Sequence, residues 1–402
     1  MKTTKENVFI TITVSLVVFL ILLLSHTISE NIKGKKKTIS VGFVYEGDAS
    51  TPYTGNFIQI QKKLEEEFEG KVKFYSIQNV SEKDGSIAIN ELINYGCNLI
   101  FTTSYGYLDD AKNFAEKYPE IQFCQATGDN ANKAPILNNY HTFMGEIYQG
   151  RYVAGIVAGI KLKELIDEGT ITADQAKIGY IGAYPYPEVI SGYTAFLLGI
   201  LTKVPQAKME VKYTNSWNNF SIEKRYAAEM IDNGCVIISQ HSDTIGPAIA
   251  CEEKSINHVV FHVGYNQSMI DVAPTTSIIS TKINWEPYIK KAIMAVMENK
   301  KIEKAVKGNV HGNDIGAGFD LDWVQIIETN SFLLPPETQS EIENTIQLFK
   351  KNKLQVFKGN YLGINPDNQY DYYNLSTGYE ENKTQSAPSF YYLLDGYITI
   401  VE

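Results

Sequence analysis

The sequence has few cysteines and little positive charge, and both shortages exclude whole classes of protein. Its 402 residues include four cysteines, and no two of them have the spacing of zinc ligands. A disulfide scaffold or a zinc-binding domain is therefore excluded. Lysine and arginine number 36 against 46 aspartates and glutamates, which gives a formal net charge of −10. Apart from a short run at 33–37 there is no basic stripe, so we expect no nucleic-acid polymer as a partner.

The sequence also lacks the signatures of an enzyme active site. His241–Asp243 reads His-Ser-Asp, but the members of a catalytic triad come from separate loops. His258 and His262 lie in an expected strand, where their spacing does not form the metal-binding face that it forms on a helix. Gly155 and Gly159 are not followed by Gly-Lys-Ser/Thr, so we interpret them as close helix packing and not as a phosphate loop. We expect no catalytic residue, no metal and no cofactor.

One long hydrophobic run is present, and it lies at the N-terminus. Residues 8–25 read VFITITVSLVVFLILLLS, which is long enough to cross a bilayer. Lysines flank the run on both sides, so their distribution does not decide its orientation. A cleaved signal peptide and an uncleaved anchor are the alternatives. Because no small-x-small cleavage site stands out, we favour an anchor over 1–37, with everything after Thr38 exported.

After Thr38, apolar runs of strand length alternate with amphipathic segments of helix length. Strands are expected over 39–45, 72–77, 99–103 and 121–126, and helices over 56–69, 85–95 and 109–118. The first of these helices has one apolar face, formed by Phe57, Ile60, Leu64 and Phe68. This alternation predicts an α/β fold with a doubly wound parallel sheet.

The series of elements then repeats along the chain. Three landmarks recur at a nearly constant offset, namely Gly42 and Gly179 at 137 residues, and Cys97 with Cys235 and Phe123 with Phe261 at 138. The repeat predicts two similar α/β lobes. We interpret the paired cysteines as buried strand residues and not as redox groups.

Two such lobes create a cleft at the carboxyl ends of their strands, where open parallel sheets bind ligands. The offset of 138 places Tyr105 and Asp243 at the same position in the two lobes. Trp217 adds a second large aromatic side chain in a polar loop. Aromatic faces opposite carboxylates and amides suit a ligand with a flat ring and a sugar.

Seven segments follow one another in order across nearly all of 38–402. They are TISVGFVYEGD, MGEIYQGRYVAGIVAG, KIGYIGAYPYPEVISGYTAFLLG, NSWNNFSIEKRYAAEMIDNGCVIISQHSD, VGYNQSM, TSIISTKINWEPYI and FKGNYLGINPDN. Together they resemble the BMP family (basic membrane protein, Med/PnrA-like), the solute-binding proteins of certain ABC importers. The resemblance implies a type I periplasmic-binding-protein fold, in which two lobes joined by three crossings close on a ligand. Characterised members of that family bind purine nucleosides.

The resemblance also implies roles for individual residues. Lys282 in STKINW matches a lysine that would hold ribose hydroxyls, and Gly264–Asn266 matches a Gly-x-Asp turn with asparagine in the place of aspartate. The loop that contains Asp48 is closer to the Med-like branch, and Asp48 has the alternative role of capping a turn. The expected ligand-binding residues are Asp48, Tyr105, Trp217, Asp243, Gly264, Asn266 and Lys282.

These observations predict the following organisation. Residues 1–37 form the anchor and a basic linker, 38–143 and 284–312 the first lobe, and 144–283 and 313–358 the second lobe. A segment rich in tyrosine and asparagine, 359–402, packs on the second lobe.

The expected function is that of the extracytoplasmic solute-binding component of an ABC importer, held at the cell membrane by its N-terminal segment. Its expected partners are a purine nucleoside or similar small ligand and the permease and ATPase subunits. The alternatives are a membrane-anchored regulator that senses a ligand with the same fold, and a binding protein for another solute such as a sugar. An enzyme acting on nucleosides is disfavoured, because no cluster of acids or histidines is evident.

Overall fold

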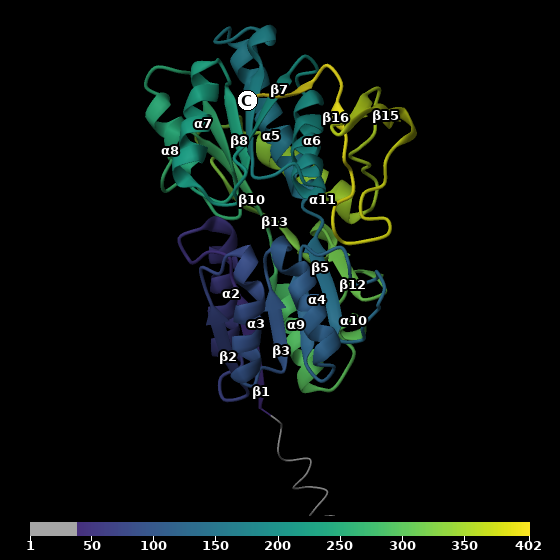
Figure 1. Ribbon diagram of the computed structural model, residues 1–402. Helices are drawn as coiled ribbons and strands as arrows, with labels where there is room; N and C mark the ends of the chain where they lie inside the picture. Colours follow the sequence, from purple (N-terminus) through teal and green to yellow (C-terminus); the bar gives the residue numbers. More distant parts are fainter. Residues whose placement is uncertain (1–37) are drawn as a thin grey trace, which may run out of the picture.

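The computed structural model describes residues 38–402, which form two α/β lobes stacked end to end (Figure 1). The first lobe is the lower one in this view, and the second lobe carries the C-terminal segment on its right-hand side. The expected anchor over 1–37 lies outside the described residues. Within 38–402, no helix is both long and apolar enough to cross a membrane.

The first lobe is built on a seven-stranded sheet. Its strands, in spatial order, are β11 (Asn309–His311), β12 (Asp314–Ala317), β5 (Tyr140–Gly145), β4 (Gln122–Ala126), β3 (Leu99–Thr102), β1 (Ile39–Val44) and β2 (Val72–Ile77). Its helices are α2 (Pro52–Glu67), α3 (Gly85–Asn94), α4 (Leu108–Lys117), α9 (Glu286–Met297) and α10 (Ile302–Ala305). All pairs from β12 to β2 are parallel, and only the edge strand β11 is antiparallel.

The second lobe is built on another seven-stranded sheet. Its strands, in spatial order, are β13 (Val324–Thr329), β10 (Ser277–Ile283), β9 (Phe261–Tyr265), β8 (Ile237–His241), β6 (Lys177–Gly182), β7 (Lys208–Tyr213) and β17 (Ile398–Ile400). Its helices are α5 (Tyr148–Asp167), α6 (Pro187–Leu201), α7 (Phe220–Asp232), α8 (Gly246–Lys254) and α11 (Thr338–Lys350). Only β13 pairs antiparallel, with β10.

The elements expected from the alternating pattern are confirmed, with small shifts at their ends. Helix α2 begins at Pro52, earlier than expected, because proline fits the first turn of a helix, where its missing N–H is not needed. The apolar face of α2 is buried against the sheet as expected, through Phe57, Ile60 and Leu64. The α/β fold class is therefore confirmed.

The expected duplication is visible in the sheet topology. The order β2-β1-β3-β4-β5 in the first sheet corresponds to β7-β6-β8-β9-β10 in the second. In both lobes a strand glycine lets a helix approach closely, because a Cβ would lie 2.9 Å from Leu92 at Gly42 and 2.8 Å from Met230 at Gly179. Cys97 and Cys235 are buried and free, as interpreted from the sequence, but they lie two residues before β3 and β8 and not within those strands.

The chain passes between the lobes at three places. It leaves the first sheet after β5, returns to that lobe after β10, and leaves again after β12 through a 3₁₀ turn at Phe319–Leu321. The boundary expected at residue 313 is therefore wrong, because β12 pairs in parallel with β5 and completes the first sheet. Likewise β5 extends the first lobe to Gly145, two residues beyond the expected limit of 143.

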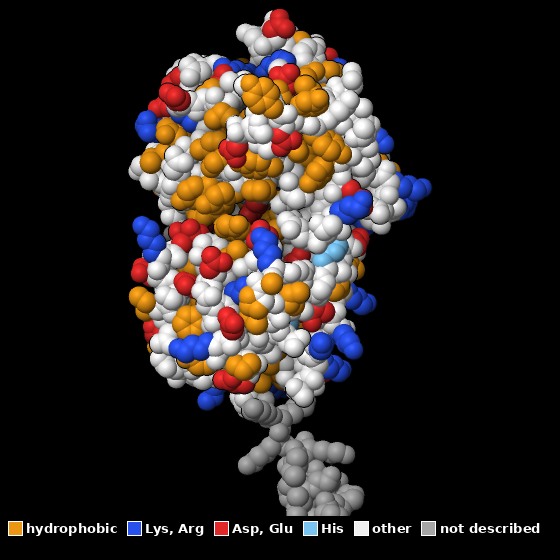
Figure 2. All heavy atoms as spheres, turned by 45° about the vertical axis from the view of Figure 1, so that its right-hand side comes forward, with side chains coloured by type: hydrophobic (Ala, Val, Ile, Leu, Met, Phe, Trp, Pro, Cys, Tyr) orange, Lys and Arg blue, Asp and Glu red, His pale blue; other side chains and the backbone are white. Residues whose placement is uncertain are grey.

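The C-terminal segment adds a small third sheet of β15 (Asn368–Asn374), β14 (Leu362–Asn365) and β16 (Leu393–Leu394). Its last strand, β17, pairs in parallel with β7, so the segment joins the second sheet as an edge strand. The face in Figure 2 shows hydrophobic side chains gathered over the second lobe and charges of both signs spread over the first. The described part of that face carries no continuous basic stripe.

Helices α5 and α6 pack so closely that their backbones are in contact. A Cβ on Gly155 would lie 2.0 Å from the carbonyl oxygen of Phe196, and one on Gly159 would lie 2.9 Å from that of Ile200. Only glycine permits this approach, so the interpretation of these two glycines as packing residues is confirmed.

Candidate functional site

A pocket lies between the two lobes, at the carboxyl ends of both parallel sheets. The first lobe contributes Glu46, Tyr53, Thr103, Ser104, Tyr105 and Thr127, and the second Glu188, Trp217, His241, Ser242, Asp243, Tyr265 and Asn266. The position matches the rule that ligands bind at the carboxyl ends of such sheets.

Four of the seven expected ligand-binding residues line this pocket. Tyr105 follows β3, and Asp243 follows β8 at the equivalent position of the other lobe. Trp217 comes from the loop after β7, and Asn266 comes from the turn after β9. As contacts to a bound ligand, all four remain predictions.

Asp48 lies outside the lining of the pocket. Its Oδ1 accepts hydrogen bonds from the amide and the hydroxyl of Ser50, at 2.8 and 2.6 Å, and its Oδ2 accepts one from Asn79. These bonds lower the pKa of Asp48. The carboxylate therefore caps the turn after β1, which is the alternative role considered for it.

Gly264 and Lys282 also lie outside the lining. A Cβ on Gly264 would lie 2.3 Å from the hydroxyl oxygen of Ser280, so the close approach of β10 requires glycine there. Lys282 is opposite Gln325 in the β10–β13 pair, and burial lowers the pKa of its amine. The role in holding a ribose that the resemblance implies for Lys282 has no support from this placement.

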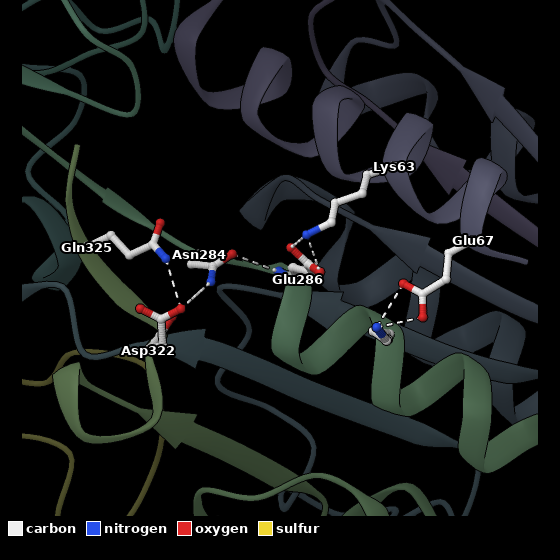
Figure 3. Close-up of polar contacts among 7 residues, drawn as sticks. Lys63, Glu67, Asn284, Glu286, Asp322 and Gln325 are labelled. Carbon is white, nitrogen blue, oxygen red and sulfur yellow. Dashed lines mark hydrogen bonds and ion pairs between the residues drawn. The ribbon is translucent and has the colours of Figure 1, made fainter. Parts of the chain in front are cut away.

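The connection after β10 is fixed by a network of polar contacts (Figure 3). The Nδ2 of Asn284 donates to the backbone oxygen of Asp322 at 2.9 Å, and Gln325 donates to the carboxylate of Asp322. On the other side of the connection, Lys63 of α2 pairs with Glu286 of α9 at 2.8 Å. This network lies at two of the three crossings, so it ties together two of the segments that connect the lobes.

Aromatic rings from both lobes meet around the pocket. The rings of Tyr105 and Tyr186 lie 5.4 Å apart across the gap between the lobes. Tyr184 stacks on Tyr186 at 5.1 Å and meets Trp217 edge-on at 5.4 Å. Of these four rings, Tyr105 and Trp217 line the pocket, and they form an aromatic wall on which a flat ligand could stack.

Glu46 is a lining residue that sequence reasoning missed. Its Oε2 accepts a hydrogen bond of 2.7 Å from the Nδ2 of Asn218, which belongs to the other lobe. Burial, together with the neighbouring carboxylate of Glu82, raises the pKa of Glu46 from 4.5 to about 7. The available signal is its place in the loop that follows β1, and Asp48 lies in the same loop.

The carboxylate of Asp243 is buried between the two lobes at the edge of the pocket. Its Oδ1 accepts a hydrogen bond of 2.6 Å from the backbone amide of Tyr53. Burial raises the pKa of Asp243 well above its ordinary value, and the acids Glu223 and Glu46 act in the same direction. Tyr53 in turn donates its hydroxyl to the backbone oxygen of Thr103. Tyr53 is a further lining residue absent from the sequence-based set.

Each lobe holds its strand-end loop with one glutamate. In the first lobe, Oε1 of Glu82 accepts from the hydroxyl of Ser104 at 2.6 Å and from the amide of Gly106 at 2.9 Å. In the second, Oε2 of Glu223 accepts from the hydroxyl of Ser242 at 2.8 Å and from the amide of Thr244 at 3.1 Å. The repeat therefore extends to the polar contacts that position Tyr105 and Asp243.

His241 and Tyr265 also line the pocket from the second lobe. The Nε2 of His241 lies 3.2 Å from Oε1 of Glu188, and burial, assisted by Arg151, lowers the pKa of the imidazole. Arg151 is completely buried, with its guanidinium carbon 3.7 Å from the ring centroid of Tyr265. None of its three side-chain nitrogens has a hydrogen-bond partner among the described residues.

Several polar atoms that line the pocket have no hydrogen-bond partner in the described part of the chain. They are Nε1 of Trp217, Nδ1 of His241, the hydroxyl of Tyr265 and Oδ1 of Asn266. Because buried polar atoms are normally paired, these atoms are available to a ligand. Within 38–402, no group of three or more histidines, cysteines or acids is arranged to hold a metal ion.

The family described as "ABC transporter substrate-binding protein PnrA-like" matches residues 40–358 of the chain. A protein of Brucella abortus (strain 2308), named as a purine-binding protein, is 29% identical over 326 residues, which are 81% of this chain and 84% of that relative. A protein of Haloferax volcanii, named as a putative ABC transporter glucose-binding protein, is 26% identical over 80% of this chain and 75% of that relative.

Among solved structures, an ABC transporter solute-binding protein of Aeropyrum pernix K1 has the same fold. Its TM-score is 0.64 at 14% sequence identity, and the match covers 78% of this chain and 92% of that one. The match to the family ends at residue 358, so the C-terminal sheet and β17 lie beyond it.

Proposed function

The chain belongs to the family of PnrA-like substrate-binding proteins of ABC transporters, and on that basis we propose that its ligand is a purine nucleoside or a similar solute with a flat ring. The protein would bind this solute outside the cytoplasm and present it to the permease and ATPase subunits of an importer. The N-terminal segment would hold the protein at the membrane.

The observation that carries the proposal is the pairing of aromatic rings with hydrogen-bonding groups in one pocket. Tyr105 and Trp217 offer ring faces for stacking, and Glu46 and Asp243 offer acceptors for the N–H groups of a base or the hydroxyls of a sugar. The name of the Brucella relative, a purine-binding protein, points to the same class of ligand.

Closure of the lobes would complete the site. The hydrogen bonds from Asn218 to Glu46 and from Tyr53 to Asp243 join the lobes directly beside the pocket. A ligand that contacts both lobes binds the closed arrangement more tightly than the open one, and this difference shifts the population toward closure. The closed form is then the one that a permease would recognise.

A sugar is the second candidate ligand. It is favoured by the carboxylates of the pocket, which accept from hydroxyls, and by the name of the Haloferax relative. A neutral monosaccharide would use the carboxylates but would leave part of the aromatic wall unoccupied. The aromatic wall therefore favours the flat ring.

Calorimetry and tryptophan fluorescence with adenosine, guanosine, inosine, uridine and glucose would test the proposal. Of the three tryptophans, only Trp217 lines the pocket, whereas Trp285 and Trp323 are completely buried elsewhere. A purine nucleoside should change the emission of the protein, and the Trp217→Phe variant should bind it without that change. Binding of glucose alone would replace the proposed ligand with a sugar, and no binding by any purine would contradict the proposal.

A further inference from the structure

The lining of the pocket has an unbalanced charge. Three carboxylates face it, from Glu46 and Asp243 on the two sides of the gap and from Glu188 in the second lobe. No lysine or arginine within 38–402 belongs to the lining. Arg151 lies against the ring of Tyr265 but does not reach the pocket.

The protein neutralises these carboxylates only in part. Each accepts a hydrogen bond from a neutral donor, namely the side-chain amide of Asn218 on Glu46, the backbone amide of Tyr53 on Asp243 and the imidazole of His241 beside Glu188. None of the three is paired with a lysine or arginine in the described chain. The second oxygen of Glu46 remains open to a ligand.

Groups next to the pocket carboxylates add further negative charge. Burial raises the pKa of both Glu46 and Asp243, and the nearby acids Glu82 and Glu223 act in the same direction. A buried carboxylate without a counter-charge is costly, and a bound cation would remove that cost. The pocket is therefore suited to a ligand that carries a positive charge.

The aromatic rings of the pocket also favour a positively charged ligand. The rings of Tyr53, Tyr105, Trp217 and Tyr265 all line the pocket. A cation over the face of such a ring gains about 0.5–2 kcal/mol, and aromatic cages of this kind recognise quaternary nitrogen. In addition, Oδ1 of Asn266, which is buried and unpaired among the described residues, offers a further acceptor.

We propose that the pocket selects a flat heterocycle that carries a positive charge over its neutral counterpart, and that it rejects anions such as phosphorylated nucleosides. The inference rests on the proposed function, which supplies a ligand with a flat ring, and it adds that this ligand carries a positive charge. Carboxylates on both lobes would approach the cation as the lobes close, so the charge would also favour the closed form.

Matched probes test this inference at neutral pH by calorimetry. The first set is 1-methyladenosine, which is cationic, with adenosine and the neutral isomer N6-methyladenosine as size controls. The second set is 1-methylnicotinamide, which is cationic, with neutral nicotinamide. Adenosine monophosphate is the anionic probe. We expect the cation of at least one set to bind about tenfold more tightly than its neutral partners, and the monophosphate not to bind.

The two proposals fail in different ways. Equal or weaker binding of both cations than of their neutral partners overturns the charge preference, while adenosine binding still supports the proposed function. Binding of the nicotinamide set alone, with the cation preferred, supports the charge preference and contradicts the purine assignment. If no probe of either set binds, both proposals are wrong.

Substitution of single pocket carboxylates then tests which residue causes the preference for a cation. Glu46→Gln keeps an acceptor for Asn218 and removes the charge, so the ratio of cation to neutral affinity should fall toward one. Glu116→Gln makes the same change at an exposed site on α4 and should keep the ratio. Glu188→Gln provides a second test if the first variant does not fold. An unchanged ratio in both pocket variants would overturn the assignment.

Discussion

The backbone amide of Tyr53 donates a hydrogen bond to Oδ1 of Asp243 with an N···O distance of 2.6 Å, and the two residues belong to different lobes. A second bond between the lobes runs from Asn218 to Glu46 at 2.7 Å. Both acceptors are carboxylates that line the pocket between the lobes. The same two groups therefore join the lobes and face the pocket, so under the proposed function ligand binding and closure would be coupled through them.

Loss of the Asp243 carboxylate should weaken ligand binding. Asp243→Ala removes both the acceptor for the Tyr53 amide and the acceptor toward the pocket, and we expect Kd to rise at least about tenfold. Asp243→Asn keeps one oxygen for the Tyr53 amide and should close normally, as small-angle scattering would report. Equal affinity of the alanine variant and the wild type, measured by calorimetry, would contradict a role for Asp243 in the site.

Stability should depend on pH through Glu46. The pKa of this carboxyl is about 7 in the folded protein, compared with an ordinary value of 4.5, so between these pH values the folded state binds more protons than the unfolded state. The contribution of Glu46 to the free energy of unfolding therefore falls as pH rises from 4.5 to about 7.

This dependence can be measured by urea unfolding at pH 5 and pH 8. Relative to wild type, the Glu46→Gln variant should be more stable at pH 8 than at pH 5, because glutamine has no charge to bury. Glu116→Gln, at an exposed position, should show no such difference. A stability difference for Glu46→Gln that does not change with pH would show that Glu46 ionises normally in the folded protein.

Removal of the Arg151 charge should cost little stability. The guanidinium is completely buried and lacks hydrogen-bond partners among the described residues, so its desolvation is offset only in part by the ring of Tyr265. Arg151→Met keeps the volume, and we expect the same or a higher free energy of unfolding. Arg151→Ala creates a cavity and should lose about 2–4 kcal/mol. A loss of that size in the methionine variant would show that the charge itself is stabilising.

Close packing of α5 on α6 should be sensitive to a single methyl group. Because a Cβ on Gly155 would lie 2.0 Å from the backbone oxygen of Phe196, Gly155→Ala must push the two helices apart. We expect a loss of about 1–3 kcal/mol in the free energy of unfolding, measured by chemical denaturation. Lys163→Ala, at an exposed position of the same helix, should change it by no more than about 0.5 kcal/mol. Full stability of the Gly155→Ala variant would contradict the backbone contact.

The sequence by itself determined the α/β class, the two lobes and the family. Alternating apolar runs and helical faces are local patterns, and the offset that relates Cys97 to Cys235 is a property of the chain alone. The ends of the strands also follow from these patterns, which is why they place Tyr105, Trp217, Asp243 and Asn266 at the cleft.

Only the tertiary structure decided which strand-end groups line the pocket. Asp48 turns away because Ser50 satisfies its carboxylate locally, whereas Glu46 is held toward the gap by Asn218, 172 residues away along the chain. Lys282 lies outside the pocket because of its place in the β10–β13 pair. Such outcomes depend on how two lobes meet, and that arrangement is made of contacts between distant residues that no local pattern encodes.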